Sequence, residues 1–281
     1  MSRGKKISRN DKESLIELMR EELRRNYYIN VDLKIKEGYV SGAGDSYAAA
    51  LCIEGKTKGR FRAIDPYEGQ EYDIKKPLIV VSISGRTKSN INLARKFKSK
   101  TEIIVITANE NSELAKIADY LILLPIQPKR LPGISTFLAS LSALYSIAGE
   151  KIDEESDVPI ILPKNPFFIG KGENYGVAYY AYLKLAEIYG EYSYFERLEQ
   201  FFHAPVFISR GSNIVIFGSN DPREELEINF AKVYKSRCKG AFCNTKWFLE
   251  SLIKRMEIEK WEKIYFLEDK EILEFSSLNI Y

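Results

Sequence analysis

Two glycine-rich segments that lie 128 residues apart constrain the fold of this chain more than any other feature. The first reads GAGDSY from Gly42 and the second reads GKGENY from Gly170, and an alanine follows each at the same distance. Each segment comes after an apolar run and opens a stretch with helical spacing. The match predicts two copies of one α/β unit; the alternative is a chance similarity between two glycine loops.

The first half of the chain alternates between apolar runs of strand length and segments with helical spacing. After an amphipathic helix over residues 8–28, strands are expected within GYVSGAGDSY, RFRAI, LIVVSI, EIIVIT and YLILLP. Helices are expected after the first, third and fourth of these runs, and a long apolar helix in GISTFLASLSALYSIAGE. Continuous apolar strands that alternate with helices are typical of a parallel sheet with helices on both faces, so the predicted fold class is α/β.

An acidic, proline-bearing stretch, EKIDEESDVPIILPKNP, predicts a linker in the middle of the chain. The predicted organisation is an N-terminal helix over 1–28, a domain over 29–150, the linker over 151–163 and a second domain over 164–281. In the second domain the strand, loop and helix pattern restarts at FFIGKGENY. A strand is expected in NIVIFGSND, a helix in EELEINFAKVYKSR, a short strand in AFCN and a helix-rich end after it.

The composition argues against several classes of protein. The formal net charge is only +3 and the basic residues form no long block, so there is no electrostatic argument for nucleic-acid binding. No apolar run reaches membrane-spanning length. The three cysteines show no metal-type spacing, and their odd number favours a reduced, cytoplasmic protein. Frequent Lys, Glu, Ile and Tyr with little Gln are typical of a thermophile.

The stretch PLIVVSISGRTKSN joins a buried strand to a helix through a loop rich in hydroxyl groups. Such a loop offers backbone N–H groups and the positive end of the helix dipole, which suits a phosphate. Ser46, in the first glycine loop, would add a donor at the same carboxyl end of the sheet. The alternative is that a serine or threonine here only caps the helix. The loop residues that would add donors, charge or a tight turn are Ser82, Ser84, Gly85, Arg86, Thr87, Lys88 and Ser89.

The corresponding loop of the second half lacks this composition. It reads GSNDPRE and carries Asp221 and Glu224, whose carboxylates would repel an anion. Only the first half is therefore predicted to bind phosphate.

The second half carries a lysine, a glutamate and the only histidine of the chain. Lys184 and Glu187 lie at i and i+3 of a predicted helix and so share a face, with Tyr180 one turn before them. His203 follows in the segment EQFFHAP. The residues alone are compatible with two interpretations. In one, Lys184 and Glu187 form a surface ion pair and His203 is a packed residue; in the other, these residues act in acid–base catalysis.

The motifs GAGDSY, SISGRT and ITANENSELAKIADYLILLP resemble the SIS (sugar isomerase) domain, a phosphosugar-binding domain. Two such flavodoxin-like domains in tandem would cover nearly the whole chain after residue 25. In that family the Ser/Thr loop binds the sugar phosphate, and Arg86 stands where the family often has Glu or Asn. The resemblance implies a phosphate site at Ser46, Ser82, Ser84 and Thr87, with Gly44, Gly85 and Arg86 as further candidates.

The segments AYLKLAEIYG and FFHAP are similar to the isomerase half of glucosamine-6-phosphate synthase and to archaeal phosphoglucose/phosphomannose isomerases. The similarity implies that Glu187 is the proton-transfer base, that Lys184 assists it and that His203 opens the sugar ring. It implies an aldose–ketose isomerase acting on a hexose 6-phosphate such as fructose 6-phosphate. The enediol mechanism needs acid–base groups and no metal or other cofactor.

Two other functions stay open at this stage. Tyr180 replaces a glutamate of the synthase pattern and no glutaminase segment precedes the first helix, so an amino-sugar phosphate isomerase, deaminase or deglycase is one alternative. A sugar-phosphate sensor without turnover is the other, although no helix-turn-helix segment is evident. In the related families the histidine acts in a neighbouring subunit, which implies a homodimer by analogy.

Overall fold

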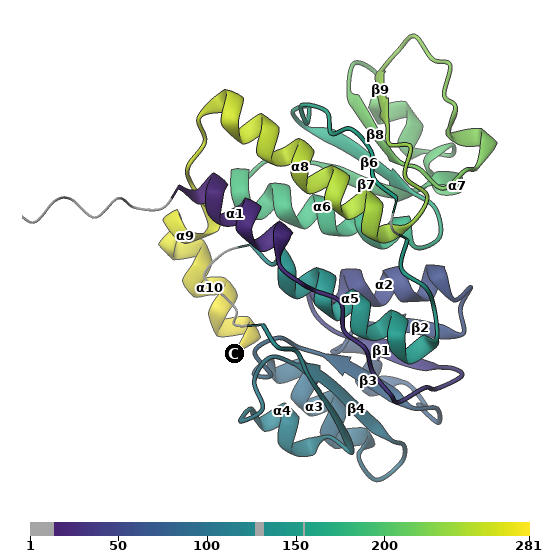
Figure 1. Ribbon diagram of the computed structural model, residues 1–281, viewed down its shortest axis with the longest axis vertical. Helices are drawn as coiled ribbons and strands as arrows, with labels where there is room; N and C mark the ends of the chain where they lie inside the picture. Colours follow the sequence, from purple (N-terminus) through teal and green to yellow (C-terminus); the bar gives the residue numbers. More distant parts are fainter. Residues whose placement is uncertain (1–13, 127–131, 154) are drawn as a thin grey trace, which may run out of the picture.

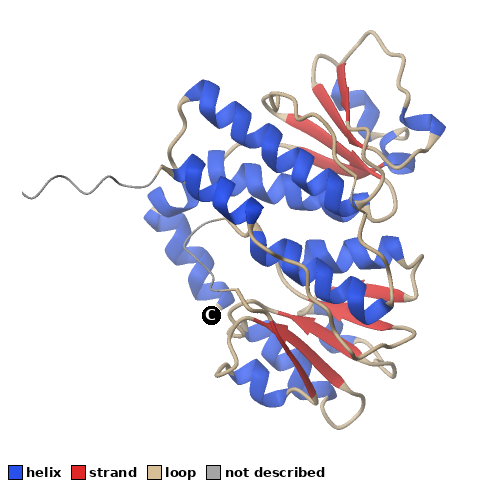
Figure 2. Ribbon diagram, viewed as in Figure 1, coloured by secondary structure: helices blue, strands red, loops and turns tan. Residues whose placement is uncertain are grey.

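The computed structural model of the chain describes residues 14–126, 132–153 and 155–281. Two sheets lie at opposite ends of the molecule, and a layer of helices separates them (Figures 1 and 2). Every strand pairing within both sheets is parallel. The predicted α/β class with parallel sheets is therefore confirmed.

The first sheet has the strand order β2-β1-β3-β4-β5, which is the flavodoxin-like order. Its central strands form because each is a short run of β-branched and other apolar residues buried on both faces. Helices α2 (Asp45–Lys56) and α5 (Ser135–Ala148) share a core with one face, and α3 (Lys88–Phe97) and α4 (Glu113–Ile117) cover the other. The strands are β1 (Gly38–Ser41), β2 (Phe61–Ile64), β3 (Leu78–Val81), β4 (Ile103–Thr107) and β5 (Tyr120–Leu123).

The second sheet repeats this order with one strand fewer, as β7-β6-β8-β9. One face packs on α6 (Asn174–Tyr189) and α8 (Ala241–Glu259), and the other face packs on the short α7 (Leu198–Phe201). The N-terminal helix α1 (Leu15–Arg24) lies against α8. The remaining strands and α-helices of the described chain are β6 (Pro166–Gly170), β7 (Tyr194–Arg197), β8 (Asn213–Phe217), β9 (Lys232–Lys235), α9 (Tyr265–Glu268) and α10 (Lys270–Ile280).

The two glycine segments form the same strand–loop–helix unit, as their sequences predict. Gly44 and Gly172 occupy equivalent turns with φ angles of +57° and +59°, which favour glycine. Helices α2 and α6, which the two loops open, pack directly on each other. A Cβ atom at Gly176 would lie 2.6 Å from the carbonyl oxygen of Ala48, so the close approach of the helices requires a glycine there.

One continuous core joins the two sheets. The largest hydrophobic cluster contains β3 and β4 side chains of the first sheet, β6 and β8 side chains of the second, and the helices between them. The division into separate domains on either side of 151–163 consequently remains a prediction.

The N-terminal helix is shorter than expected. The sequence predicts a helix over 8–28, of which residues 8–13 lie outside the described part of the chain, and the helix ends at Arg24. The backbone then runs extended across α5, because the N–H groups of Ile29 and Val31 donate to the hydroxyls of Ser142 and Ser146. The predicted extension to residue 28 is therefore wrong.

Two predictions for the second half are also wrong. The segment EELEINFAKVYKSR forms no α-helix: it contains the strand β9, which adds to the edge of the sheet beside β8. The segment AFCN is the first turn of α8 rather than a strand. The carboxylate of Asp153 accepts hydrogen bonds from the N–H groups of Phe242 and Cys243, which stabilises this helix start. Strand β7 was not predicted.

The predicted linker contains no helix or strand among its described residues, but it packs closely on α8. The indole N–H of Trp247 donates to the carbonyl of Val158 at 3.0 Å, and Ile160 N–H donates to Ser251 Oγ at 3.1 Å. Near the start of α8, Cys238 and Cys243 form a disulfide, which differs from the reduced thiols that the sequence favours. Within the described part of the chain, no helix is long and apolar enough to cross a membrane.

Candidate active site

A pocket of about 430 Å³ opens at the carboxyl ends of the adjacent strands β1 and β3. It contains all four hydroxyl residues of the predicted phosphate site, and Arg86 and Glu187 as well. Ligands of parallel sheets bind at this edge, so its position agrees with the sequence prediction. The lining residues are Ala43, Asp45, Ser46, Ser82, Ile83, Ser84, Arg86, Thr87, Asn90, Glu187 and Tyr281.

The loop after β3 is held in a tight turn around Gly85. This glycine has a φ angle of +64°, its N–H donates to the carbonyl of Ser82 at 3.1 Å, and a Cβ atom there would lie 2.1 Å from Ser112 Oγ. Thr87 occupies the N-cap position of α3, yet its side chain makes no capping hydrogen bond with the described residues. The geometry thus argues against simple helix capping by Thr87 and leaves its hydroxyl for a ligand.

Five residues that line the pocket were not predicted as site residues: Ala43, Asp45, Ile83, Asn90 and Tyr281. Asn90, in the first turn of α3, is 1% exposed, and its Oδ1 has no hydrogen-bond partner among the residues that the structure describes. The guanidinium of Arg86 lies over the ring of Tyr281, 5.8 Å from its centroid. The position of Asn90 three residues after Thr87 is a local signal, whereas no local signal places Tyr281 at this loop.

Lys184 is completely buried and joins two carboxylates from different elements. Its Nζ lies 2.8 Å from Asp45 Oδ2 at the start of α2 and 2.5 Å from Glu187 Oε2 on its own helix. Its charge also lies 5.2 Å from the ring of Tyr180, whose hydroxyl donates to the carbonyl of Gly133. Asp45 and Glu187 line the pocket, but Lys184 does not.

The charged groups of this cluster perturb one another. Burial raises the pKa of Asp45 to about 6; the positive charge of Lys184 opposes this rise and the negative charge of Glu187 adds to it. For Lys184, burial lowers the pKa, but the attraction of Asp45 and Glu187 outweighs it, so the pKa is raised and the ammonium stays charged. The cluster therefore presents one fixed cation behind two carboxyl groups that face the pocket.

His203 lies apart from the pocket within one chain. It follows α7, its side chain is 68% exposed, and its Nε2 is 3.5 Å from the carboxylate of Glu199. It is not among the residues that line the pocket. Of the three predicted catalytic residues, the structure thus brings Lys184 and Glu187 together and leaves His203 at the surface.

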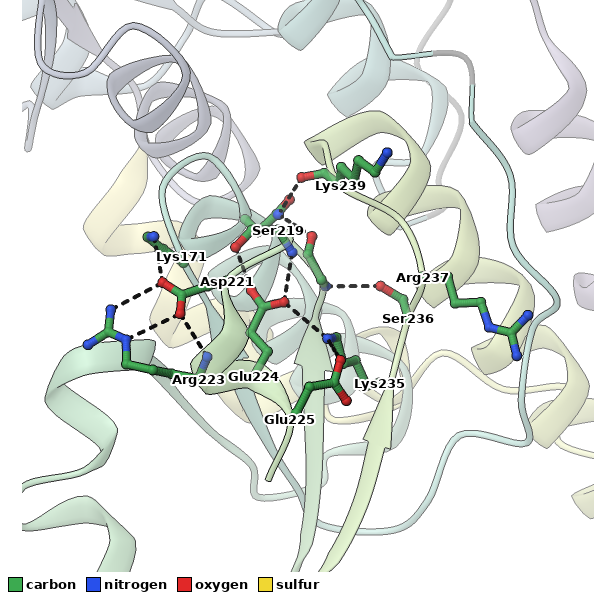
Figure 3. A network of polar contacts seen from close by, with 12 residues as sticks. Lys171, Ser219, Asp221, Arg223, Glu224, Glu225, Lys235, Ser236, Arg237 and Lys239 are labelled. Atoms are coloured by element: carbon green, nitrogen blue, oxygen red, sulfur yellow. Dashed lines mark hydrogen bonds and ion pairs between the residues drawn. The ribbon is translucent and has the colours of Figure 1, made fainter. Parts of the chain in front are cut away.

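At the equivalent edge of the second sheet, carboxylates form ion pairs and hydrogen bonds with neighbouring donors (Figure 3). Asp221 pairs with Lys171 at 2.6 Å, and the hydrogen bond from Arg223 is the main cause that lowers its pKa. The buried Glu224 accepts a hydrogen bond from Ser219 N–H at 3.0 Å and pairs with Lys235. The donors of Lys171, Arg223, Ser219 and Lys235 beside these two carboxylates are therefore already engaged.

Comparisons with known proteins agree with this architecture. The structure of glucosamine-6-phosphate deaminase from Thermotoga maritima is similar, with a TM-score of 0.68, 19% identity, and coverage of 89% of this chain and 95% of that chain. The C-terminal domain of glucosamine-fructose-6-phosphate aminotransferase from Francisella tularensis gives 0.63, 15% identity, and coverage of 89% and 94%. Tagatose-6-phosphate ketose/aldose isomerase from Escherichia coli gives 0.60, 15% identity, and coverage of 89% and 88%.

At these identities the structural similarities show the fold alone. No curated protein sequence matches the chain. The family model of the SIS domain matches residues 70–148, which run from the segment before β3 to the end of α5. That match lies within the first predicted domain, so the second SIS domain expected from the sequence remains a prediction. The chain thus carries a match to the SIS domain over residues 70–148, and the hydroxyl loop after β3, which lines the pocket described above, lies within it.

Proposed function

We propose that this protein is a phosphosugar isomerase that interconverts the aldose and ketose forms of a hexose 6-phosphate. One observation carries the proposal: the carboxylate of Glu187 opens onto the same pocket as the hydroxyls of Ser46, Ser82, Ser84 and Thr87. A phosphate anchor and a carboxylate in one pocket are the two groups that the isomerisation of a sugar phosphate requires. The SIS domain match and the folds of the similar structures agree with this assignment.

The chemistry follows from the arrangement. The hydroxyl loop and the start of α3 bind the phosphate, which orients carbons C1 and C2 toward Glu187. Glu187 removes the proton from one of these carbons and returns it to the other through an enediol. The buried ammonium of Lys184 holds the Glu187 carboxylate in place and offsets negative charge that develops on the substrate oxygens.

A second copy of the chain supplies His203 in this proposal. The histidine lies outside the pocket of its own chain, and Phe202, Phe207 and Ile208 beside it are exposed apolar side chains. Burial of such side chains between two copies would stabilise a homodimer. The imidazole of the neighbouring chain would then open the sugar ring.

A second candidate function is the conversion of an amino-sugar phosphate. It is favoured by Asp45, which places a second carboxylate beside Glu187 where a substrate ammonium would bind. The printed name of the Thermotoga maritima structure, a glucosamine-6-phosphate deaminase, agrees with it. The two candidates differ in whether turnover requires an amine.

The test is an assay of fructose 6-phosphate conversion, with and without ammonia, that separates glucose, mannose and glucosamine 6-phosphates. We expect turnover without ammonia in the wild type. The Glu187→Gln variant should lose this turnover, and the Glu227→Gln variant should keep it, since Glu227 is an exposed glutamate outside the pocket. Product only with ammonia would replace the isomerase by the amino-sugar reaction. Saturable binding of fructose 6-phosphate without any turnover would indicate a sensor and refute both.

A further inference from the structure

The 128-residue repeat extends to a pair of ion pairs between α2 and α6. Asp45, at the start of α2, lies 2.8 Å from Lys184 on α6. Glu173, directly before α6, lies 3.2 Å from Lys56 at the end of α2. Asp45 and Glu173 are equivalent positions of the two glycine segments, and Lys56 and Lys184 are separated by the same offset. Each helix segment therefore contributes the acid of one ion pair and the lysine of the other.

The two acids differ in how their oxygens are used. Glu173 accepts hydrogen bonds from Tyr145 and from the N–H of Ala241 in addition to its pairing with Lys56, so both of its oxygens have protein partners. Asp45 uses Oδ2 for Lys184, whereas its Oδ1 is buried and has no hydrogen-bond partner within the described part of the chain. Of the two, only Asp45 lines the pocket.

The position of Lys184 excludes it from direct contact with a ligand in this pocket. The lysine is 0% exposed and does not line the cavity, because Asp45 and Glu187 lie between its ammonium and the open space. Among the described residues that line the pocket, the carboxyl groups that can exchange protons with a ligand are those of Asp45 and Glu187. An aldose–ketose isomerisation needs two proton transfers, one between carbons and one between oxygens.

We propose that Asp45 is a further catalytic residue, which carries the proton between the substrate oxygens O1 and O2 while Glu187 carries the proton between C1 and C2. The assignment rests on the proposed isomerase function. From the aldose, protonated Asp45 gives its proton to O1 as Glu187 takes the proton of C2, and an enediol forms. Asp45 then takes the proton of the O2 hydroxyl as Glu187 returns its proton to C1. Both carboxyls end in their starting states, so the atoms balance.

The surroundings of Asp45 suit this role. Lys184, Glu187 and the phenol of Tyr180 face it from α6, and Arg86 lines the same pocket from the loop after β3. Since its pKa is raised to about 6, the carboxyl carries a proton for part of the time just below neutral pH. Isomerisation by this residue should therefore decrease as the pH rises above that value.

The experiment compares Asp45→Asn with its repeat-related control, Glu173→Gln. Both changes weaken an ion pair between α2 and α6, but only the first removes a carboxyl from the pocket. The expected result is a decrease of kcat by about 10²- to 10⁴-fold in Asp45→Asn, with the Kd of inorganic phosphate unchanged within about threefold. The alkaline decrease of kcat near pH 6 should persist in wild type and in Glu173→Gln and disappear in Asp45→Asn. The wild type and both variants are assayed with the same substrate, so ionisation of the substrate contributes equally to all three pH profiles.

Each outcome decides between distinct conclusions. If the wild type shows turnover and the kcat of Asp45→Asn lies within threefold of the kcat of Glu173→Gln, this inference is overturned and the isomerase function stands. A decrease of kcat that leaves the alkaline limb in place would assign Asp45 a structural role only, and it would overturn the inference too. Absence of turnover in the wild type would overturn the proposed function and this role together. Should Asp45→Asn fail to fold, Asp45→Ser, which the first helical turn tolerates, replaces it in the same comparison.

Discussion

Replacement of Lys184 by methionine should destabilise the protein strongly and in a pH-dependent way. The ammonium is fully buried between two carboxylates that are 23% and 31% exposed. Removal of one member of a fully buried ion pair costs about 3–5 kcal/mol, and the partial exposure of the carboxylates lowers our estimate to about 2–4 kcal/mol at neutral pH. The side chains have similar volume, so most of this loss is electrostatic rather than a cavity effect.

The stability that the Lys184→Met variant loses should be smaller at acidic pH than at neutral pH. Without Lys184, Asp45 and Glu187 repel each other, and the pKa of Asp45, already raised to about 6 with the lysine present, rises further. A carboxyl whose pKa is higher in the folded than in the unfolded state reduces stability above the folded pKa. This penalty disappears as the pH falls below the unfolded value near 4. The variant should therefore lose less stability at pH 4.5 than at pH 7.5.

Urea denaturation at these two pH values measures the effect, with Lys56→Met as the matched control. Lys56 forms the repeat-related pair with Glu173, which keeps its hydrogen bonds from Tyr145 and Ala241, so its loss should cost only about 1 kcal/mol. Equal destabilisation by the two changes, or a loss that is the same at both pH values, would refute the reasoning.

Three further predictions concern ligand binding and assembly. Thr87→Val should weaken the binding of inorganic phosphate, measured by calorimetry, by about tenfold or more, because a hydrogen bond to a charged group is worth about 1.5–3 kcal/mol; unchanged affinity would exclude Thr87 from the phosphate site. Gly85→Ala should abolish that binding, because its Cβ atom would lie 2.1 Å from a serine hydroxyl. The control Gly211→Ala has a φ angle of +76° and no atom within 4 Å of its Cβ atom, so it should cost only backbone strain of about 1 kcal/mol and retain phosphate binding. An equal mixture of inactive His203→Gln and Glu187→Gln chains, refolded together, should regain about one quarter of wild-type turnover if each site takes its histidine from the partner, and none if the histidine acts within its own chain.

The parts of the fold that the sequence predicted are those with a strong local pattern. Strand β3 (Leu78–Val81) and strand β4 (Ile103–Thr107) are apolar runs buried at every residue, and such runs are recognisable without the rest of the chain. Strands β7 and β9 lie at the edges of their sheet and contain charged residues, so their sequences, YFER and KVYK, carry no such signal. They are strands because β6 and β8 offer free edges, which is tertiary information.

The candidate site divides in the same way. The hydroxyl loop was predicted because its residues are contiguous and its motif is local. The contact of Asp45 with Lys184 joins residues 139 positions apart, and it depends on how α2 packs on α6. The repeat did contain a signal for it, since the 128-residue offset that relates the glycine loops also relates Lys56 to Lys184.

The two halves contribute different groups to the pocket, so neither half forms the candidate site alone. The first half kept an open hydroxyl loop, whereas in the second half Asp221 and Glu224 engage the equivalent donors. Conversely, Glu187 has no acidic counterpart, since the position 128 residues before it is Gly59. In the proposed function, the anion anchor thus comes from one half and the base from the other. The contact of α2 with α6 brings them together, and the glycine at position 176 allows that contact. A change that separates these two helices should therefore remove turnover while leaving the phosphate loop itself intact.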